Sequence, residues 1–594
     1  MRHQPGYAQR RPEPRQGGSV PLKRHHTSHP TEAEVTLGKL ATATALAVQR
    51  EGFAVVVRRL RGRPNITEGV DQVPHKASRL LQHLRRKGAS VWTKTLPWGA
   101  ERCDEAVRQG SHKSAHEDRE FVFQEMADFC TQGYWAVLPY TVVRDSVNLC
   151  VSPLEAVPQR DRRPGLIVDY IFSAVNAETV PLAPAESMQF GRALQRVMAR
   201  IVQAEQRYGH VHLAKIDIAD GFYRVGLQIA DIPKLGVVLP TSPGQPALIA
   251  FPLTLPMGWV ESPPYFTALT ETACDLANQS LRERDKRARR MGAHRLEAVA
   301  ATSPPDAGEP RTGAAIHPVE HRAPQGCPPV AAVDVYVDDF LLTAQTETQK
   351  HDVMRASLHA IDAVFEPLSP QDPPHRKEPA SVKKMLHGDA CCWATTKGIL
   401  DWDLNTVAGT LHLPPHRLER LHELLDTISP SKKRVSVKTW RKLLGELCSM
   451  SPALPGSRGL FSILQAALSK ADRNRVRITP QVWHMAGDFR AIATTLGTRP
   501  TRLRELIPAA PAYVGACDAC QLGMGGVWFS LATNTPPIVW RQSFPSACAR
   551  VGRVRKLDRR PVHLGSRTHG APRPQGRPRA ASPGGGAHAL DGDR

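Results

Sequence analysis

The sequence predicts a multidomain protein of the α+β class. Short apolar runs bounded by polar turns, such as residues 212–218 and 333–337, are typical of β-strands. After Leu411 the apolar residues instead recur every three or four positions, which is typical of amphipathic helices. With 594 residues the chain is about four times the length of a typical domain. We therefore expect several domains around at least one large core.

The first segment with a clear period lies near residue 120. Val122, Met126 and Cys130 recur at a helical spacing, and Gly133 is a typical helix stop. The first 30 residues are rich in Arg, His and Pro and have no apolar period, which is typical of a disordered arm. We expect residues 1–115 to form a basic, partly disordered N-terminal extension.

Five short strands are expected after this helix, at residues 135–138, 149–151, 166–168, 212–218 and 333–337. The fourth contains Asp217, and the fifth runs directly into Asp338 and Asp339. Strands that end in acids therefore recur in this part of the chain.

The remaining sequence divides by composition. Residues 281–330 combine a basic run with Pro, Gly and Ala, which predicts a disordered insertion in a loop. Two leucine-rich helical stripes follow, and the end of the chain is rich in Arg, Pro and Gly. The expected regions are a mixed region over residues 116–410, a helical region over 411–500, a strand segment over 508–545 and a disordered tail over 546–594.

The charge balance favours a polyanionic partner. Lys and Arg number 78 against 56 Asp and Glu, a formal net charge of +22, so nucleic acid is the leading partner and a membrane surface the rival. No apolar stretch reaches the roughly 18–20 residues that span a bilayer, and no signal-peptide core follows Met1. We expect an intracellular protein with no membrane partner and leave nucleus or cytoplasm, and the oligomeric state, open.

Eleven cysteines, an odd number, favour reduced thiols over a disulfide framework. Cys517 and Cys520 form a CxxC pair, but no second pair or histidine stands at zinc-finger spacing. An ordinary strand sequence is the better interpretation.

The acids at the strand ends carry the chemistry. Asp338 and Asp339 stand between two apolar strands, at an expected hairpin tip, where they repel each other unless a cation holds them. Asp217 supplies a third carboxylate if the strands are neighbours. Such oxygen ligands suit Mg²⁺, and two ions about 4 Å apart support in-line nucleotidyl transfer. A solvated acidic turn is the alternative for any such pair taken alone.

Three segments in this order resemble motifs A, B and C of reverse transcriptases from retrotransposons and retroviruses. They are residues 214–223 (AKIDIADGFY), 255–266 (LPMGWVESPPYF) and 335–340 (VYVDDF). Residues 161–170, followed by Asn176, resemble the fingers segment that precedes them in this family. The resemblance runs from about Phe121 to Leu468.

The resemblance implies a right-hand polymerase with fingers, palm and thumb, in which residues 116–410 are fingers and palm and 411–500 the thumb. It implies two Mg²⁺ ions, with Mn²⁺ as a substitute, and an RNA template, a DNA primer and dNTPs as partners. The implied metal-binding and catalytic residues are Asp217, Asp338 and Asp339.

The resemblance also implies binding residues. Phe222 would stand where the family places a ring against the sugar, leaving no room for a 2′-hydroxyl; a plain core aromatic is the alternative. The other implied nucleotide-binding residues are Arg163, Asp220, Gly221, Met257 and Gly258. The implied template and primer contacts are Tyr336, Trp259, Ser262, Pro263, Lys438 and Arg441, for which solvated surface charge is the alternative at the basic positions.

Several positions depart from the family pattern. Gly165 stands where many relatives have an arginine that contacts the triphosphate, and Arg163 is the candidate substitute. Asp401 replaces a glycine of the primer-side segment. Lys383 and Lys384 stand near the place of a lysine that could protonate pyrophosphate in related enzymes.

The segment after residue 512 resembles the opening strand of a ribonuclease H domain, in which Asp518 would be the first of four metal-binding acids. The later acids Asp558, Asp591 and Asp593 lie in Arg, Pro and Gly-rich sequence. One carboxylate cannot hold two Mg²⁺ ions, so we expect a truncated remnant without ribonuclease H activity.

Three functions remain under consideration. The leading hypothesis is an RNA-directed DNA polymerase of a retrotransposon. The second is a catalytically inactive retroelement relic that at most binds nucleic acid, which the departures from the pattern favour. The third, an RNA-directed RNA polymerase, is disfavoured by the bulky Phe222.

Overall fold

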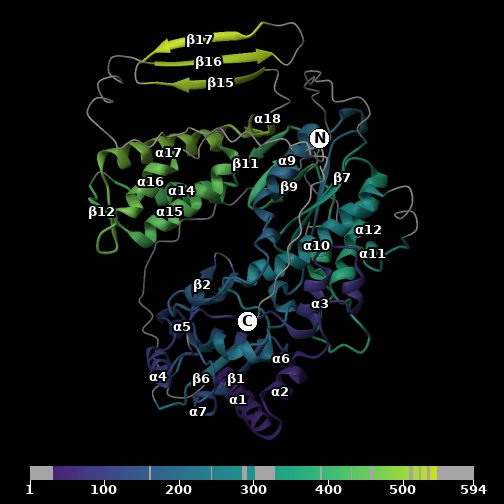
Figure 1. Ribbon diagram of the computed structural model, residues 1–594, viewed down its shortest axis with the longest axis vertical. Coiled ribbons are helices and arrows are strands. Elements are labelled where there is room, and N and C mark those ends of the chain that lie inside the picture. Colours follow the sequence, from purple (N-terminus) through teal and green to yellow (C-terminus); the bar gives the residue numbers. More distant parts are fainter. Residues whose placement is uncertain are drawn as a thin grey trace, which may run out of the picture. The chain divides into compact units, whose positions relative to one another are not determined.

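The structure is a computed structural model of a chain that divides into two compact units, residues 1–508 and 509–594 (Figure 1). It describes residues 31–95, 97–159, 162–241, 244–283, 291–301, 328–387, 391–429, 431–454, 460–507, 513–520, 523–530 and 536–544. The expected N-terminal arm and C-terminal tail lie outside these residues. Helices and mostly antiparallel strands are both present in the first unit, so the chain is of mixed α and β structure. No helix among the described residues combines the length and apolar composition that crossing a bilayer requires.

Six helices at the start of the described chain belong to the core of the first unit. Leu37, Val57 and Leu81 are at most 1% exposed and share one hydrophobic cluster with the strands that follow. We expected a basic, partly disordered extension over residues 1–115. Its described part instead forms helices that bury apolar faces, which their irregular spacing hides in the sequence. The helices are α1 (Glu32–Glu51), α2 (Phe53–Arg61), α3 (Ser78–Lys87), α4 (Ala100–Gln109), α5 (Lys113–Glu117) and α6 (Arg119–Thr131).

A five-stranded sheet lies against these helices, and α1 and α6 both contact its first strand. Its order is β1-β6-β5-β2-β3, with β2 and β5 parallel and the other pairs antiparallel. The strands are β1 (Trp135–Pro139), β2 (Val151–Gln159), β3 (Arg162–Val168), β5 (Gly236–Val238) and β6 (Leu248–Pro252), and the short helices near them are α7 (Tyr140–Val143) and α8 (Val175–Glu178).

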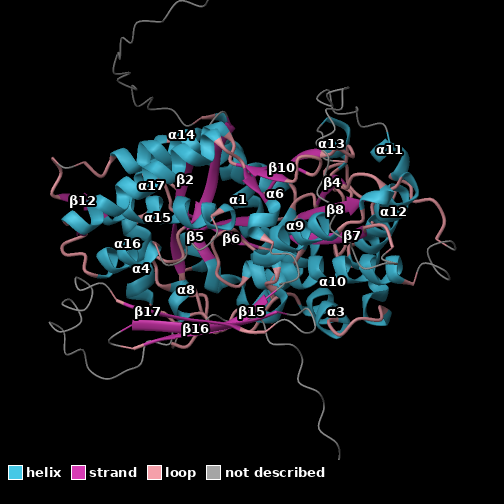
Figure 2. Cartoon of the chain, turned by 90° about the horizontal axis from the view of Figure 1, so that it is seen from above, coloured by secondary structure: helices cyan, strands magenta, loops and turns pink. Residues whose placement is uncertain are grey.

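A second, three-stranded antiparallel sheet carries the acids, in the order β4-β8-β7. Helices α10 and α12 contact this sheet and each other, and both lie beside it in the view of Figure 2. The elements are β4 (His212–Asp217), β7 (Ala331–Tyr336), β8 (Asp339–Ala344), α10 (Ser262–Arg282) and α12 (Glu347–Val364).

Part of the expected insertion is ordered and attached to α12. Residues 291–301 contain the short helix α11 (Glu297–Ala301). The Arg355 guanidinium pairs with the Glu297 carboxylate at 2.7 Å, and His294 Nε2 lies 2.8 Å from Asp362 Oδ2. Residues 291–301 therefore differ from the disordered loop expected over 281–330, because polar anchors that composition does not reveal fix them. Residues 284–290 and 302–327 lie outside the described chain.

The helical region has its own hydrophobic cluster, which begins earlier than residue 411. Ile399, Trp402 and Leu404 join the cluster through a four-stranded sheet in the order β14-β11-β10-β9, and Val197 of α9 joins it from the preceding region. The expected boundary at residues 410 and 411 therefore falls inside a strand. The elements are α9 (Ala193–Gln203), α13 (Val382–His387), β9 (Thr396–Ile399), β10 (Trp402–Asn405), β11 (Thr410–His412), α14 (Pro415–Asp426), β12 (Arg434–Ser436), α15 (Val437–Met450), α16 (Phe461–Ser469), β13 (Arg475–Arg477), α17 (Pro480–Thr498), β14 (Thr501–Arg502) and α18 (Leu503–Leu506).

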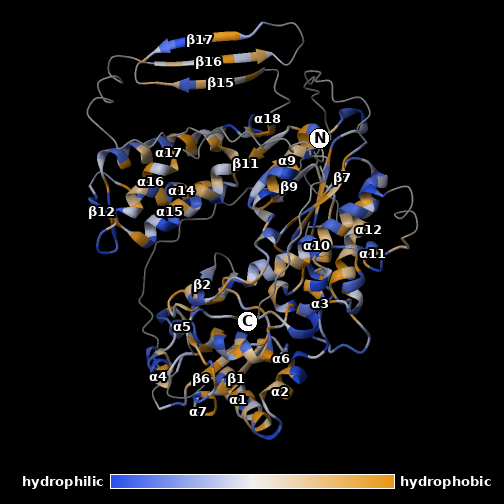
Figure 3. Ribbon diagram, viewed as in Figure 1, coloured by the Kyte–Doolittle hydropathy of each residue, from blue (hydrophilic) through white to orange (hydrophobic). Residues whose placement is uncertain are grey.

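The second unit contains an antiparallel sheet in the order β15-β16-β17. Its strands are β15 (Tyr513–Ala519), β16 (Gly523–Ser530) and β17 (Ile538–Ser543), with hydrophobic stretches along β16 and β17 (Figure 3). Trp528, Phe529 and Val539 are 45%, 51% and 74% exposed. These three strands alone therefore do not enclose a hydrophobic core.

Gly133 lies between α6 and β1, and replacing it tests how the N-terminal helices pack against the sheet. Its φ is +73°, and a Cβ atom there would lie 2.1 Å from the carbonyl oxygen of Leu60. We predict that Gly133→Ala lowers the free energy of unfolding by at least about 2 kcal/mol, because left-handed strain and a backbone clash add together. Urea denaturation of the full chain measures this.

The matched control is Gly445→Ala in α15, where a Cβ would meet nothing within 4 Å. Its helix propensity should raise stability by about 0.5–1 kcal/mol. Equal denaturation midpoints for Gly133→Ala and the wild type would contradict the packing described for the N-terminal helices.

Candidate active site

A tight hairpin turn positions two of the three acids. Strands β7 and β8 pair up to Tyr336 and Asp339, so only Val337 and Asp338 remain in the turn. Val337 has a φ of +58°, which is unfavourable for a β-branched side chain. Such strain persists only where the surrounding structure fixes it, and here two buried strands hold both ends of the turn.

The third acid comes from the neighbouring strand. Asp217, the last residue of β4, pairs directly with Asp339 across the β4–β8 ladder. The next residue, Ile218, donates its N–H to the Asp338 carbonyl oxygen at 3.1 Å. The sheet register therefore brings Asp217, Asp338 and Asp339 to one end of the three-stranded sheet.

The three carboxyl groups repel one another in a poorly solvated place. Burial raises the pKa of Asp217, and the nearby Asp338 charge raises it further. Burial and the Asp339 charge raise the pKa of Asp338, and burial and the Asp217 charge raise that of Asp339. Each carboxylate is therefore harder to ionise than usual, and the site favours any cation that enters it.

One cation from the chain is already present. Lys384 of α13 places its Nζ 2.7 Å from Asp217 Oδ1, and this ion pair opposes the rise in the Asp217 pKa. The helix is held in place because the Ser381 N–H, just before it, donates to the Asp217 carbonyl oxygen at 2.8 Å. Lys383, the residue before Lys384, is exposed and makes no ion pair with the described residues.

The donor set suits a hard divalent cation by its chemistry. Buried carboxylate oxygens that repel one another are typical ligands of Mg²⁺. In the described part of the chain, however, no three His, Cys, Asp or Glu side chains are arranged so that all could hold one ion. To bind a metal ion, Asp217 would have to give up its ion pair with Lys384.

The loop after β4 holds the sugar-facing candidate Phe222. Asp220 adopts a φ of +62°, and its carboxylate accepts hydrogen bonds from the Tyr134 hydroxyl at 2.6 Å and from Lys377 Nζ at 2.5 Å. This carboxylate is therefore committed to the protein, and Gly221 continues the turn with a φ of +37°. The Phe222 ring is half-buried and packs edge-on against Phe266, with centroids 5.2 Å apart.

Gly258 in the motif B-like turn is required by the protein itself. Its φ is +102°, and a Cβ there would lie 2.3 Å from the Val168 carbonyl oxygen at the end of β3. The Asn176 amide clasps the same turn, because it donates to the Gly258 carbonyl oxygen and accepts from the Val260 N–H. The resemblance implied that Gly258 binds a nucleotide, and the structure shows the end of β3 as its close neighbour. Met257 beside it is 48% exposed.

Two residues that the resemblance implied as template contacts have buried side chains. Trp259 is 1% exposed and donates its Nε1–H to Thr179 Oγ1 at 3.3 Å. Ser262 is 0% exposed and donates its hydroxyl to the Pro256 carbonyl oxygen at 2.7 Å. Pro263 is half-buried in the first turn of α10. These residues shape the turn, so their types follow from packing.

The remaining candidates lie at the surface. Tyr336 is 36% exposed at the hairpin. Lys438 and Arg441 are exposed on α15 and pair with no acid among the described residues. Arg163 on β3 pairs with Glu125 of α6 at 3.1 Å. Its side chain is 70% exposed in this ion pair, so the contact with Glu125 does not decide whether it also binds a triphosphate.

Asp518 lies on β15 opposite Gly525, and it is the acid of the described second unit. Asp161, Asp558, Asp591 and Asp593 lie outside the described residues.

The departure at Asp401 falls in the turn between β9 and β10, where Leu400 and Asp401 have φ of +51° and +61°. A glycine would fit this turn with less strain.

Sequence reasoning missed the residues that hold the site from outside the motifs. Tyr134 and Lys377 fix Asp220, and Asn176 fixes the Gly258 turn; only Asn176 had been singled out, as part of the fingers-like segment. The partners in these contacts are separated by 82 to 157 residues in the chain. No local pattern in a single sequence could have paired them.

No protein-family model matches the chain, and no curated protein matches it. Among solved structures it is similar to foamy viral protease–reverse transcriptase chains. One, described as dRH and in complex with double-stranded DNA, has 14% identity and a TM-score of 0.39 over 82% of this chain and 67% of that chain. Another double-stranded DNA complex has 15% identity and a TM-score of 0.39 over 83% and 80%. A complex with an RNA/DNA hybrid has 13% identity and a TM-score of 0.40 over 83% and 52%, so this chain spans about half of it. Likeness at this level carries no functional inference.

The acid cluster should cost stability at neutral pH. Because the folded-state pKa of Asp339 is raised, the stability from this group is present at low pH and lost as the pH rises through that pKa. We predict that Asp339→Asn in EDTA raises the free energy of unfolding at pH 7 by about 1 kcal/mol, and that the difference vanishes near pH 3. Urea denaturation at both pH values measures it.

The control is Asp488→Asn, an exposed acid of α17 that makes no ion pair with described residues. It should leave stability unchanged at both pH values. A loss of stability in Asp339→Asn at pH 7 would show that the carboxylates are not in repulsion.

Proposed function

We propose that the chain is a nucleotidyltransferase, an RNA-directed DNA polymerase of retrotransposon type that extends a primer with dNTPs. The observation that supports this most is the register of the β4–β8 pair, which sets Asp217 opposite Asp339 with Asp338 in the adjoining turn. One buried and two half-buried carboxylates that repel one another have no stabilising role in the fold. As ligands of divalent cations, these carboxylates would have a function.

The proposed metal ligands are Asp217, Asp338 and Asp339, as the motif resemblance implies. When bound, two Mg²⁺ ions would activate the primer 3′-hydroxyl and stabilise the leaving pyrophosphate. The chain itself supplies three things: carboxylates whose positions the sheet fixes, a strained turn that sets Asp338, and the Lys384 ammonium beside Asp217. Lys384 is also the candidate that holds a proton near a departing pyrophosphate.

Phe222 supports selection of deoxynucleotides. Its ring is held by edge-on contact with Phe266 beside the loop that leaves Asp217, so it cannot yield easily to an added hydroxyl. A fixed ring at the sugar excludes the 2′-hydroxyl by steric clash. Asp220 and Gly221 would contribute through the backbone, because the Asp220 carboxylate is already bonded.

Exposed cations support binding of a nucleic acid backbone. Lys438 and Arg441 on α15 have no acidic partner among the described residues, and the chain carries a net charge of +22. A grip of this kind on an RNA template and DNA primer is independent of sequence. We further propose that ribonuclease H activity is absent, because Asp518 has no second acid in the described part of its unit.

A catalytically inactive retroelement relic is the second candidate. It is favoured by the ion pair between Lys384 and Asp217 and by the absence, among the described residues, of three ligands arranged around one point. Arg163 is engaged by Glu125, and Gly165 offers no side chain in its place. Such a relic would retain at most the nucleic-acid binding.

The polymerase assay separates these candidates. We predict Mg²⁺-dependent incorporation of dNTPs on an RNA template with a DNA primer, reduced at least about 100-fold by Asp338→Asn because a metal ligand is lost. Primer extension by the full chain measures it, with Asp488→Asn as the exposed-acid control. Absence of any Mg²⁺-dependent extension in the wild type would favour the relic.

A sugar-selection assay tests Phe222. We predict that Phe222→Ala lowers the preference for dNTPs over NTPs at least about tenfold, mainly through faster NTP use, because the ring no longer fills the space of the 2′-hydroxyl. Single-nucleotide incorporation kinetics with both substrates measure the ratio. Phe222→Tyr keeps the ring and should keep the preference; an unchanged ratio in Phe222→Ala would contradict the role.

A further inference from the structure

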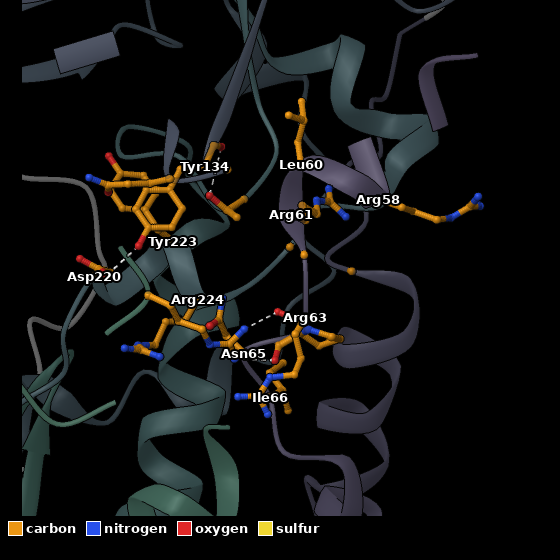
Figure 4. A pocket seen from close by; sticks show the side chains of 18 of the residues that line it. Arg58, Leu60, Arg61, Arg63, Asn65, Ile66, Tyr134, Asp220, Tyr223 and Arg224 are labelled. Carbon is orange, nitrogen blue, oxygen red and sulfur yellow. Dashed lines mark hydrogen bonds between the residues drawn. The ribbon is translucent and has the colours of Figure 1, made fainter. Parts of the chain in front are cut away.

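A cavity of about 520 Å³ lies beside the loop that follows β4 and is separate from the acid cluster. The ends of α2 and α3, the segment 373–377 and the residues after Asp220 line it. Figure 4 shows two of its sides, with Tyr134, Asp220, Tyr223 and Arg224 facing the stretch from Arg58 to Ile66. Asp217, Asp338 and Asp339 are absent from this lining.

The lining is strongly cationic. Ten of its residues are Arg or Lys, and Asp220 is its one acid. Four of the cations have acidic partners: Arg59, Arg63, Arg376 and Lys377. The cations that pair with no carboxylate of the described chain are Arg58, Arg61, Arg85, Arg86, Lys87 and Arg224.

Two of these guanidinium groups are desolvated. Arg224 is 4% exposed and donates only to the carbonyl oxygens of Ala219, Lys377 and Glu378. Arg61 donates to the Leu227 carbonyl oxygen at 2.5 Å, while its buried Nε has no partner. Burial lowers the pKa of both guanidinium groups to about 10. Desolvated cations that form no ion pair are costly, and an anion in the cavity would reduce that cost.

Helix ends explain part of the pattern but not all of it. Basic residues at the C-termini of α2 and α3 are stabilised by the helix dipoles, by about 0.3–1 kcal/mol each. This accounts for neither the buried Arg224 nor the meeting of both helix ends at one cavity. Close backbone contacts at two glycines hold the two helix ends at the cavity. A Cβ at Gly88 would lie 2.4 Å from the Leu227 carbonyl carbon, and one at Gly133 would meet Leu60.

We propose that this cavity binds a compact polyphosphate anion, the group that a nucleoside triphosphate or inorganic tripolyphosphate carries. Its volume is that of a small-molecule pocket, which suits a compact anion better than an extended strand. Guanidinium forks match phosphate oxygens in geometry and charge. The exposed Arg86 and Lys87 line the cavity together with the half-buried Arg61 and the buried Arg224, so an anion can contact both pairs.

The test is calorimetric titration of the full chain with inorganic tripolyphosphate in EDTA, where no divalent cation can recruit it to the acid cluster. Saturable binding is expected, weakened at least about tenfold in the double variant Arg86→Gln/Lys87→Gln. Both side chains are exposed, so the fold should survive their replacement. The matched control is Lys76→Gln/Arg79→Gln, which removes the same charge from the region of α3 outside the lining and should bind as the wild type does.

Competition identifies the source of the anion. A nucleoside triphosphate should displace tripolyphosphate, while a ten-nucleotide single strand with a 5′-hydroxyl should not. Absence of saturable binding, equal weakening in the two double variants, or displacement by the strand alone would each overturn the proposal. Because the assay contains no divalent cation, it is independent of the polymerase activity proposed above.

Discussion

The pairing of β4 with β8 is the constraint on which the rest of the site depends. It places Asp217 opposite Asp339, and the tight turn adds Asp338 beside them. The sheet therefore holds like charges together against their repulsion, using the burial of residues such as Ile216 and Phe340 on the same strands. A sheet can do this because register is a collective property: one strand cannot slip without turning its apolar side chains out of the core.

The loop after β4 connects two regions of opposite charge. On one side lie the three carboxylates, and on the other lies the cationic cavity with Arg61 and Arg224. Asp220 belongs to the cavity lining and is bonded to Tyr134 and Lys377. Charges buried at such density are stable only with counter-charges, and the chain supplies some of these itself, as Lys384 does for Asp217. Unequal charge on the two sides of one loop points to two different ligands.

Local patterns were reliable where a single element decides the outcome. The strands expected around residues 135, 212 and 333 are β1, β4 and β7, and the expected helix before Gly133 is α6. Patterns do not decide between a packing role and a binding role for a single side chain. Trp259 and Ser262 match a motif that suggests ligand contact, yet both are buried and bonded within the turn. A single sequence gives residue types but not the direction in which a side chain points.

The sequence by itself determined which residues carry charge and how each short segment folds, because propensity, period and turn chemistry act over a few neighbours. It also determined that Asp338 and Asp339 meet at a hairpin, since both strands adjoin them. Only the tertiary structure decided that Asp217 lies opposite Asp339, that Lys384 reaches Asp217, and that the helices of residues 31–115 join the core to enclose a basic cavity. These contacts span tens to hundreds of residues, and they form because burial of apolar faces, which has no fixed sequence separation, brings the segments together.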